Sequence, residues 1–162
     1  VILSTDTLRY EWGKVGSARI DDAGNIYVLD RWIQAIVKFD SDGRLLLIER
    51  KNPPFQGGWA LPGGFVDVGE TVEDAAAREL KEETSIAFSS DALSLIGVFS
   101  APDRDPRGHT VSVAFGAVLR EPLTPRAADD AARAEWVADW QALSFAFDHG
   151  DIIADAHTKL FR

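Results

Sequence analysis

The sequence predicts a mixed α/β fold in which helices cover a β-sheet. Segments rich in β-branched and aromatic residues occur before, between and after two helix-like segments, the order expected when helices pack on a sheet. The chain has 162 residues, about the size of one domain, and no internal repeat or low-complexity linker divides it. We expect a single compact domain, with its main part at 32–162 and an N-terminal β extension at 1–31.

The composition argues against several classes of protein. Hydrophobic residues make up 46% of the chain and charged residues 27%, values typical of a globular protein and too apolar for a disordered one. The formal net charge of -9 opposes association with nucleic acid or anionic lipid, and no apolar run approaches the roughly 20 residues that span a bilayer. Without cysteine, any bound metal must have oxygen or histidine ligands. We expect a cytoplasmic protein that binds neither nucleic acid nor membrane.

Two β-hairpins are predicted in the N-terminal third of the chain. Turn residues separate short strands at 18–20 and 26–29, and a second turn separates longer strands at 32–39 and 44–50. The shorter pair is the extra hairpin of the N-terminal extension.

The clearest helix in the sequence begins near Thr71 and runs to about Glu83. The Thr71 hydroxyl and the Asp74 carboxylate have the spacing of a capping box, which closes the first turn of a helix. Prolines and glycines make the preceding residues 51–58 a loop.

Strands and a second helix are predicted in the rest of the chain. Strands are expected at 93–100 and 110–120. Residues 126–133 are predicted to form a polar, alanine-rich loop, followed by a short strand at 135–137. A final helix at 148–160 carries its apolar residues on one stripe.

Three glutamates of the first helix fall on its apolar side. Successive helical residues turn by about 100°, so Glu82 and Glu83 lie within about 60° of Glu79. The apolar residues of the same arc are Val72, Ala75 and Ala76. The opposite arc holds Asp74, Arg78 and Lys81. An acidic run on a helix is most often a solvated face, but a position next to the core argues for another role.

That role is the binding of a divalent metal ion. Converging carboxylates repel one another, and partial burial raises the cost unless a cation neutralises them. Oxygen ligands favour Mg²⁺ or Mn²⁺, and Mg²⁺ typically binds a few carboxylates together with substrate phosphates. The acidic residues of this helix therefore predict a protein that acts on a phosphate-containing substrate.

The residues around this helix resemble the Nudix box, whose pattern is G-x5-E-x7-R-E-U-x-E-E-x-G-U, where U is aliphatic. The matching residues are Gly64, Glu70, Arg78-Glu79-Leu80, Glu82-Glu83 and Ile86. Ser85 departs from the pattern, which has glycine at the point where the helix ends. Glycine there permits a left-handed backbone, so the departure concerns the local turn and removes no carboxylate.

The resemblance implies a Nudix fold, in which helices sandwich a mixed sheet, and Mg²⁺-dependent hydrolysis of a nucleoside diphosphate linked to another group. The metal ligands it implies are Glu79, Glu82, Glu83 and the carbonyl of Gly63. The residues it implies for orienting them are Arg78 and Glu70.

Two segments outside the box, 100–109 and 145–149, resemble ADP-ribose pyrophosphatases of the archaeal and bacterial type. The resemblance extends from about residue 32 to residue 160. It implies ADP-ribose as the substrate, with AMP and ribose 5-phosphate as products. It also implies a homodimer, to which we expect residues 1–31 to contribute.

Several residues are candidates for contacting the substrate. Arg104 and Arg107 can offer planar guanidinium groups to phosphate or ribose, although ion pairs with the neighbouring aspartates explain them equally well. Trp59 can stack on adenine, but ordinary packing is the more frequent role of a tryptophan. His149 is expected to be structural, and Asp148 to be a helix N-cap.

The base that activates water has candidates in two places. Asp129 and Asp130 lie together in a predicted loop, from which a carboxylate can reach a bound substrate. They equally suit a helix cap for residues 131–134. Glu82 is the alternative on the helix, because metal activation of water can suffice without a separate base. Glu135 is expected to be an exposed strand residue without a catalytic role.

Other functions stay open alongside ADP-ribose hydrolysis. Within the same class, the substrate could be a dinucleoside polyphosphate, NADH, a nucleotide sugar or an oxidised nucleoside triphosphate, since the box supplies only the metal site. From another class, a non-catalytic ADP-ribose-sensing regulator would need a basic DNA-binding extension, which a chain of net charge -9 ending at Arg162 disfavours.

Overall fold

The computed structural model describes residues 17–20, 26–29, 32–119, 123–128 and 131–161. The strands are β1 (Ser17–Ile20), β2 (Ile26–Leu29), β3 (Trp32–Asp40), β4 (Leu45–Arg50), β5 (Trp59–Ala60), β6 (Ser94–Phe99), β7 (Val111–Leu119) and β8 (Ala131–Val137). The helices are α1 (Val72–Thr84) and α2 (His149–Leu160), with short 3-10 turns at Ser90–Ala92 and Trp140–Ala142. Neither α1 nor α2, the two longer helices of the described residues, has the length and apolar character needed to cross a bilayer.

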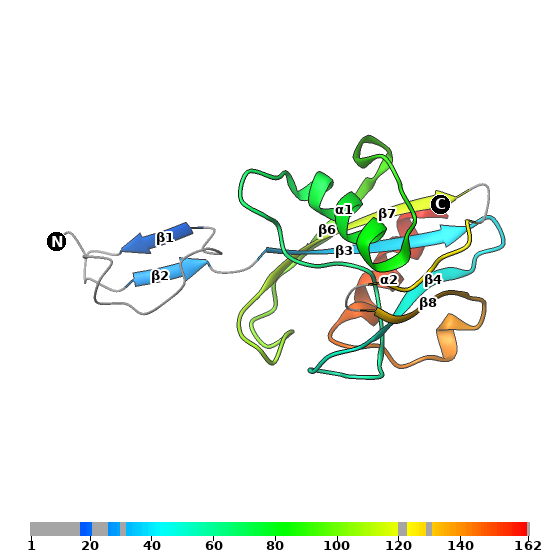
Figure 1. The fold of residues 1–162 in the computed structure, drawn as a ribbon. Coiled ribbons are helices and arrows are strands. Elements are labelled where there is room, and N and C mark those ends of the chain that lie inside the picture. Colours follow the sequence, from blue (N-terminus) through cyan, green and yellow to red (C-terminus); the bar gives the residue numbers. More distant parts are fainter. Residues whose placement is uncertain (1–16, 21–25, 30–31, 120–122, 129–130, 162) are drawn as a thin grey trace.

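The main sheet is mixed and has the strand order β5-β4-β3-β7-β6, with β8 also paired to β4. Strands β3 and β7 run parallel along their whole length, from Trp32 opposite Val111 to Asp40 opposite Leu119. The other pairs are antiparallel. Strands β1 and β2 form a separate antiparallel hairpin, drawn apart from the main sheet in Figure 1.

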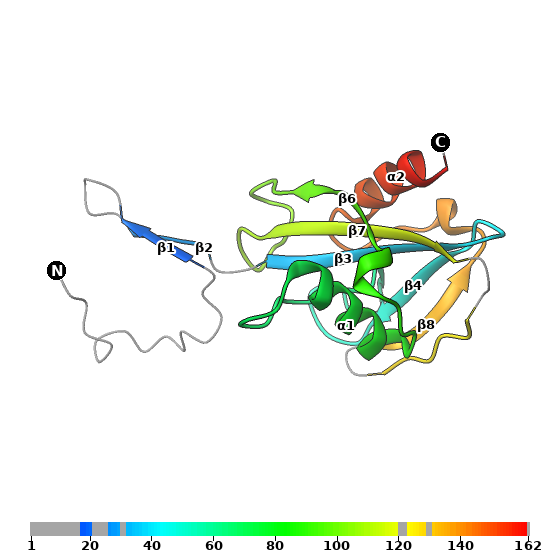
Figure 2. The same ribbon diagram turned by 90° about the horizontal axis from the view of Figure 1, so that it is seen from above.

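The two helices cover opposite faces of the main sheet, as Figure 2 shows from above. Side chains alternate across a strand, so Ile36 of β3 faces α1 while Val37 faces α2. The core on the α1 side contains Ile36, Leu46, Ala76, Leu80, Ile86, Val113 and Phe115. The core on the α2 side includes Val37, Phe39, Leu45, Leu47, Ile152, Ile153 and Ala156. Burial on both faces explains the apolar runs at 35–37 in β3 and at 45–48 in β4.

Most predicted elements are confirmed. The two N-terminal hairpins form, and α1 begins directly after Thr71, whose Oγ1 accepts a hydrogen bond of 3.1 Å from the backbone N–H of Asp74. Strand β7 ends at Leu119, and the last predicted strand residue, Arg120, lies outside the described residues.

The region after residue 126 differs from the prediction. Residues 131–133 belong to β8 and not to a loop, and the helix cap suggested for residues 131–134 is wrong. Alanine has low strand propensity, so the composition favoured a loop. Pairing with β4, from Arg50 opposite Ala131 to Leu45 opposite Val137, overrides that local preference.

Candidate active site

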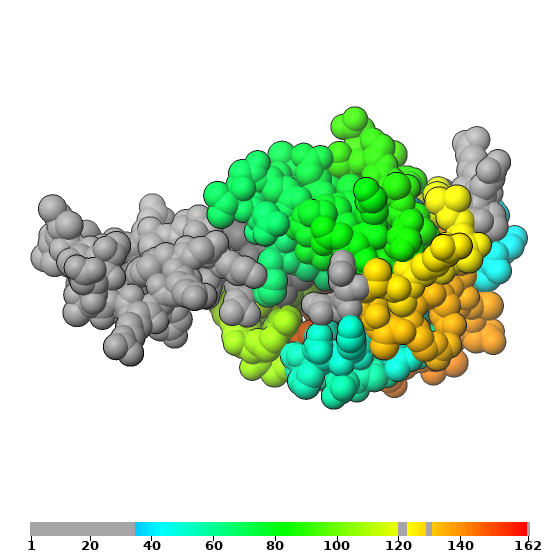
Figure 3. All heavy atoms as spheres, in the orientation of Figure 1, coloured from blue at the N-terminus to red at the C-terminus, as the bar shows by residue number. Residues whose placement is uncertain are grey.

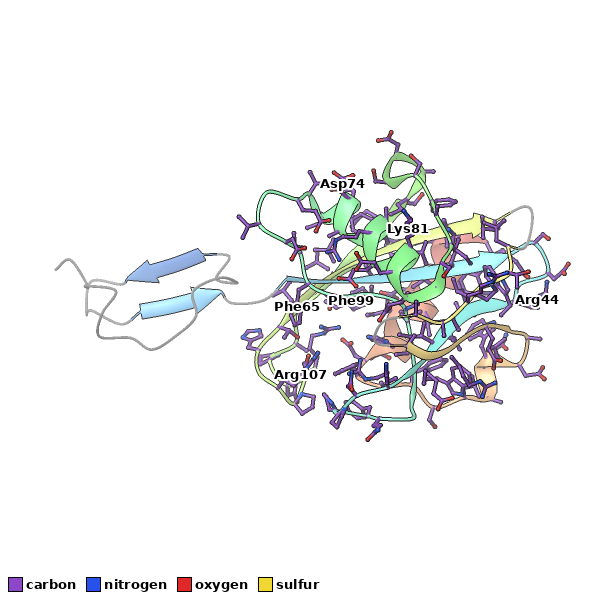
Figure 4. All side chains as sticks on the ribbon, in the orientation of Figure 1. Arg44, Phe65, Asp74, Lys81, Phe99 and Arg107 are labelled. Atoms are coloured by element: carbon purple, nitrogen blue, oxygen red, sulfur yellow. The ribbon has the colours of Figure 1, made fainter. Side chains whose placement is uncertain are left out.

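A cavity of about 720 Å³ opens at the end of the sheet where β4 finishes and β7 begins. Its lining comes from the loops after β4 and β5, from α1, from the β6–β7 loop and from the start of α2. In Figure 3 the green surface of α1 lies above the lime surface of the β6–β7 loop and the teal surface of the loop after β4. Figure 4 places Phe65 and Arg107 at this end of the sheet and Arg44 at the other.

Helix α1 forms the acidic wall of the cavity. Its three box glutamates all line the cavity, but they differ in exposure. Glu83 is buried, the Glu79 side chain is 16% exposed and the Glu82 side chain is 45% exposed. The predicted position next to the core is therefore confirmed for Glu79 and Glu83, whereas Glu82 lies at the solvent edge of the stripe.

Arg78 holds the acidic wall together. Its Nε and Nη2 donate to the two carboxylate oxygens of Glu70, both at 2.9 Å. Its Nη1 donates to Glu79 at 2.8 Å and to Glu82 at 3.1 Å, and Nη2 also donates to the carbonyl of Phe65 at 2.9 Å. Its assignment to the arc opposite the glutamates is corrected by these contacts, because the long side chain turns back across the helix edge.

The electrostatics of the wall follow from this pairing. Hydrogen bonding to Arg78 is the main reason why the pKa of Glu70 lies below its usual value. Burial raises the pKa of Glu79 even though Arg78 is beside it. Glu79 is thus a poorly solvated carboxyl group, whose ionised form would be stabilised by additional positive charge.

Gly64 leaves the space that the Glu79 carboxylate occupies. A Cβ on Gly64 would lie 2.3 Å from Glu79 Oε1, far inside van der Waals contact. The neighbouring N–H of Gly63 donates to Glu83 Oε2 at 2.9 Å. The loop before α1 is therefore fitted against two of the box glutamates.

The acidic wall has the chemistry of a site for a hard divalent ion. Within the part of the chain that the structure describes, no three acidic or histidine side chains are grouped so that they could hold a metal ion as they stand. Arg78 holds Glu79 and Glu82, and the Gly63 N–H holds Glu83. Carboxylate and carbonyl oxygens are the ligands that Mg²⁺ and Mn²⁺ prefer, so this donor set fits such an ion.

Ser85 makes the turn that glycine makes in the family pattern. Its backbone is left-handed, with φ 60° and ψ 11°, and its N–H donates to the carbonyl of Lys81 at 2.8 Å. Its hydroxyl donates to the carbonyl of Arg126 at 3.2 Å. The helix therefore ends at the expected place without glycine.

Arg104 lines the cavity but is bound within the protein. Its guanidinium makes two hydrogen bonds to Asp148, of 2.7 and 2.5 Å, and a third of 2.6 Å to Ser112. Its partner is thus neither of the neighbouring aspartates. The predicted N-cap position of Asp148 on α2 is confirmed, but its side chain makes no capping hydrogen bond and accepts from Arg104 instead.

A second part of the cavity lining, which we call the basic wall, carries basic side chains. It includes Arg50, Lys51 and Arg107, of which sequence reasoning identified only Arg107. Arg107 donates to Asp105 through Nε and Nη2, and its side chain stays 33% exposed. Basic residues at the end of a predicted strand and directly after it are a signal that could have identified Arg50 and Lys51.

Phe147 is a second residue that sequence reasoning missed. It lines the cavity, and the guanidinium carbons of Arg50 and Arg107 lie 4.9 and 5.2 Å from its ring centre. Phe55 contacts the same ring edge-on at 4.9 Å. Cations over an aromatic face are attracted by its quadrupole, so Phe147 holds both guanidiniums near one place.

The remaining predicted residues have different positions. Trp59 does not line this cavity; it packs against the core on the α2 side, with the Arg133 guanidinium 5.3 Å from its ring centre. His149 is buried and accepts a hydrogen bond from the backbone of Leu61, as expected of a structural histidine. Asp129 and Asp130 lie outside the described residues.

Comparisons with known proteins show the family of the chain. Residues 30–156 match the family model described as NUDIX domain. The chain is 49% identical over 121 residues to the ADP-ribose pyrophosphatase of Methanocaldococcus jannaschii, covering 72% of this chain and 67% of that protein. It is 36% identical over 121 residues to the ADPR responsive transcriptional repressor NtrR of Acinetobacter baylyi, covering 72% of this chain and 48% of that protein.

A similar solved structure is a bifunctional NMN adenylyltransferase/ADP ribose pyrophosphatase from Francisella tularensis, complexed with AMP and a manganese ion. It is 32% identical, with a TM-score of 0.72 over 80% of this chain and 41% of that one.

Proposed function

The chain belongs to the Nudix family, and we propose that it hydrolyses ADP-ribose to AMP and ribose 5-phosphate with Mg²⁺, or Mn²⁺, as the cofactor. The observation that carries the proposal is the arrangement of charge in one cavity. Carboxylates of α1 and the basic residues Arg50, Lys51 and Arg107 line the same cavity. A diphosphate needs both, because its oxygens bind guanidinium groups directly and bind carboxylates through a shared cation.

On this proposal the metal ion is held by the acidic wall. The residues that would hold it are Glu79, Glu82, Glu83 and the carbonyl of Gly63. The bound ion supplies neutralisation of the phosphate charge and activation of water. Arg78 and Glu70 set the positions of the carboxylates, since Arg78 bonds to Glu70 and to two of the three glutamates.

The basic wall would bind the diphosphate. Arg107 and Arg50 present guanidiniums beside Phe147, and part of the Arg107 side chain is open to solvent. Arg104 acts differently from our expectation of a direct substrate contact, since Asp148 and Ser112 occupy its donors. Its role in this proposal is to hold the start of α2 against β7 beside the cavity, through its bonds to Asp148 and Ser112.

For the base we propose Asp129 or Asp130, with Glu82 as the competing candidate. Glu82 is the most exposed of the three box glutamates, which suits a proton acceptor. If the base is in the loop, Asp129→Asn or Asp130→Asn lowers kcat more than it raises KM, and Glu135→Gln is near neutral. Full kcat in both aspartate variants, with loss in Glu82→Gln, would assign the base to the helix.

The choice of ADP-ribose is supported by two relatives with that activity in their names, from M. jannaschii and F. tularensis. The direct test is incubation with ADP-ribose and Mg²⁺, followed by chromatographic identification of AMP and ribose 5-phosphate. EDTA should abolish product formation. Release of product from a dinucleoside polyphosphate, NADH, a nucleotide sugar or an oxidised nucleoside triphosphate, with none from ADP-ribose, would reassign the substrate.

A regulator is the second candidate, favoured by the similarity to the ADPR responsive repressor of A. baylyi. A sensor should bind ADP-ribose and leave it intact. Binding of ADP-ribose in calorimetry, without AMP appearing over several hours with Mg²⁺, would select the sensor over the enzyme.

We also propose a homodimer to which residues 1–31 contribute, in the cytoplasm. The separate β1–β2 hairpin supports the first point, because two strands alone are marginally stable and gain from a partner surface. The absence of cysteine supports the second. Light scattering that gives the monomer mass at micromolar concentration would rule out the dimer under those conditions.

A further inference from the structure

We infer that His149 is a positioning residue of the active site: it fixes the loop 61–64, whose backbone sets Glu83 and the Gly63 carbonyl. The inference rests on the proposed function, because that proposal gives these two groups their metal-binding role. It goes beyond the structural role that a buried histidine ordinarily has.

The contact that carries the inference joins residues 88 positions apart. The backbone N–H of Leu61 donates to Nδ1 of His149 at 2.9 Å, in a buried hydrogen bond. Because Nδ1 accepts, the ring proton of this tautomer is on Nε2. Burial lowers the pKa of His149 to about 4, so the ring remains a neutral acceptor at neutral pH.

The loop that begins at Leu61 is tied to three elements within three residues. Leu61 is held by His149 of α2, the carbonyl of Pro62 accepts from Ile36 of β3 at 3.0 Å, and the N–H of Gly63 donates to Glu83 of α1 at 2.9 Å. The φ angle of Pro62 is restricted by its ring, so the backbone at Pro62 can absorb little of a shift of Leu61. Most of that shift is therefore transmitted to Gly63. Loss of the hydrogen bond between Leu61 and His149 should therefore weaken the hydrogen bond by which Gly63 positions the Glu83 carboxylate.

The histidine itself is firmly held. The N–H of Ala146 donates to the carbonyl of Trp59 at 2.8 Å, a second tie between the same two segments. Asp148, next to His149, is clamped by two hydrogen bonds from Arg104, which also bonds Ser112 of β7. A rigid support that orients a ligand-bearing group is the arrangement by which outer residues tune a metal site.

The test compares substitutions that differ in where they place an acceptor. His149→Asn puts a side-chain oxygen near the position of Nδ1, whereas His149→Gln puts its polar group near Nε2. His149→Leu has no acceptor at all. His157→Asn is the control, because His157 is an exposed histidine of the same helix and does not line the cavity.

Two quantities are measured in the full chain: amide hydrogen exchange of Leu61 and Gly63, and the affinity for Mn²⁺ followed by electron paramagnetic resonance. We expect Gln and Leu at position 149 to speed exchange of both amides and to weaken Mn²⁺ binding about 10-fold or more. Asn at position 149, and the His157 control, should stay close to wild type in both.

The outcomes separate this inference from the proposed function. If Gln or Leu lowers the melting temperature but leaves Gly63 exchange and Mn²⁺ affinity unchanged, His149 only stabilises the fold and the inference is wrong. It is also wrong if Asn weakens binding as much as Gln, because the acceptor then does not matter. A wild-type chain that neither binds Mn²⁺ nor hydrolyses nucleotides contradicts the proposed function, and Gly63 exchange then decides the inference alone. Should Leu fail to fold, the Asn and Gln pair gives the answer.

Discussion

At the scale of single residues, Arg78 is the counter-ion of the acidic wall. It bonds three carboxylates, those of Glu70, Glu79 and Glu82. This pairing raises the pKa of the guanidinium above its usual value, so the positive charge is permanent. A divalent ion entering the site therefore competes with Arg78 for Glu79 and Glu82, while Glu70 keeps the arginine in place.

Glu79→Gln and Glu83→Gln should each lower kcat by about 100-fold or more, because each removes the charge of a metal ligand and leaves its volume. The fold should persist, as judged by circular dichroism. Glu73→Gln is the matched control, since Glu73 is an exposed residue of the same helix that does not line the cavity. A wild-type rate for either ligand variant at saturating Mg²⁺ would disprove its assignment.

Phe147→Leu should raise KM for ADP-ribose by about 5-fold and change kcat little. The ring holds the Arg50 and Arg107 guanidiniums, and loss of a cation–π contact is worth about 1 kcal/mol. Steady-state kinetics check this, with Phe161→Leu as control, because Phe161 packs on Phe39 away from the cavity. An unchanged KM would show that the arginines need no aromatic support.

At the scale of elements, the end of α1 is strained. Ser85 adopts a left-handed backbone, which costs a residue with a side chain about 1 kcal/mol relative to glycine. Ser85→Gly should raise the free energy of unfolding by up to about 1 kcal/mol in urea denaturation. A decrease would mean that the hydroxyl bond to the Arg126 carbonyl outweighs the strain.

Strand β3 carries a buried lysine on the α1 side of the sheet. Lys38 is fully buried, and its Nζ has no hydrogen-bond partner among the described residues, although it lies 3.3 Å from the centre of the Phe88 ring. Burial lowers the pKa of Lys38 from 10.5 to about 7. Between these values the unfolded chain binds more protons than the folded one, so stability rises with pH across this window.

Lys38→Met should therefore stabilise the protein by about 1–3 kcal/mol at pH 7. The substitution removes the buried Nζ, which has no hydrogen-bond partner among the described residues, and methionine fills a similar volume. The gain should shrink as the pH rises towards 10.5. Urea denaturation at pH 7 and pH 9.5 measures both effects, with Lys81→Met, an exposed lysine of α1, as control. Destabilisation at pH 7 would show that the contact with Phe88 dominates.

At the scale of the whole molecule, the cavity joins segments from both sides of the sheet. Helix α1 packs on one face and α2 on the other, yet Glu83 of α1 and His149 of α2 both contact the loop at 61–64. Ligand binding there is coupled to the stability of the whole fold, because the site does not exist in the unfolded chain.

Mg²⁺ together with ADP-ribose should raise the melting temperature, and more than either alone. A ligand at 100 times its Kd stabilises the fold by about 2.7 kcal/mol, which is roughly 5–10 °C for a chain of this size. Differential scanning fluorimetry measures the shift, and Glu83→Gln should lose most of it. A clear shift with another nucleotide, and none with ADP-ribose, would reassign the substrate.

Local chemistry determined the acidic half of the site. Helix α1, its cap at Thr71 and the positions of Glu79 and Glu83 follow from a 3.6-residue period and neighbouring residues, so they were predictable from the sequence. The box pattern added the assignment to a family and a class of reaction. Both N-terminal hairpins were predictable for the same reason, since their turns are local.

The rest was decided by contacts between distant residues. Arg104 meets Asp148 across 44 positions and Leu61 meets His149 across 88, and no local pattern specifies such partners. Strand β8 forms against its own composition because β4 offers a pairing edge, and Lys38 is buried because its strand has no open face. Side-chain period and turn chemistry act over a few residues, whereas the basic wall and the support of the metal loop exist only when the folded sheet brings these segments to one end.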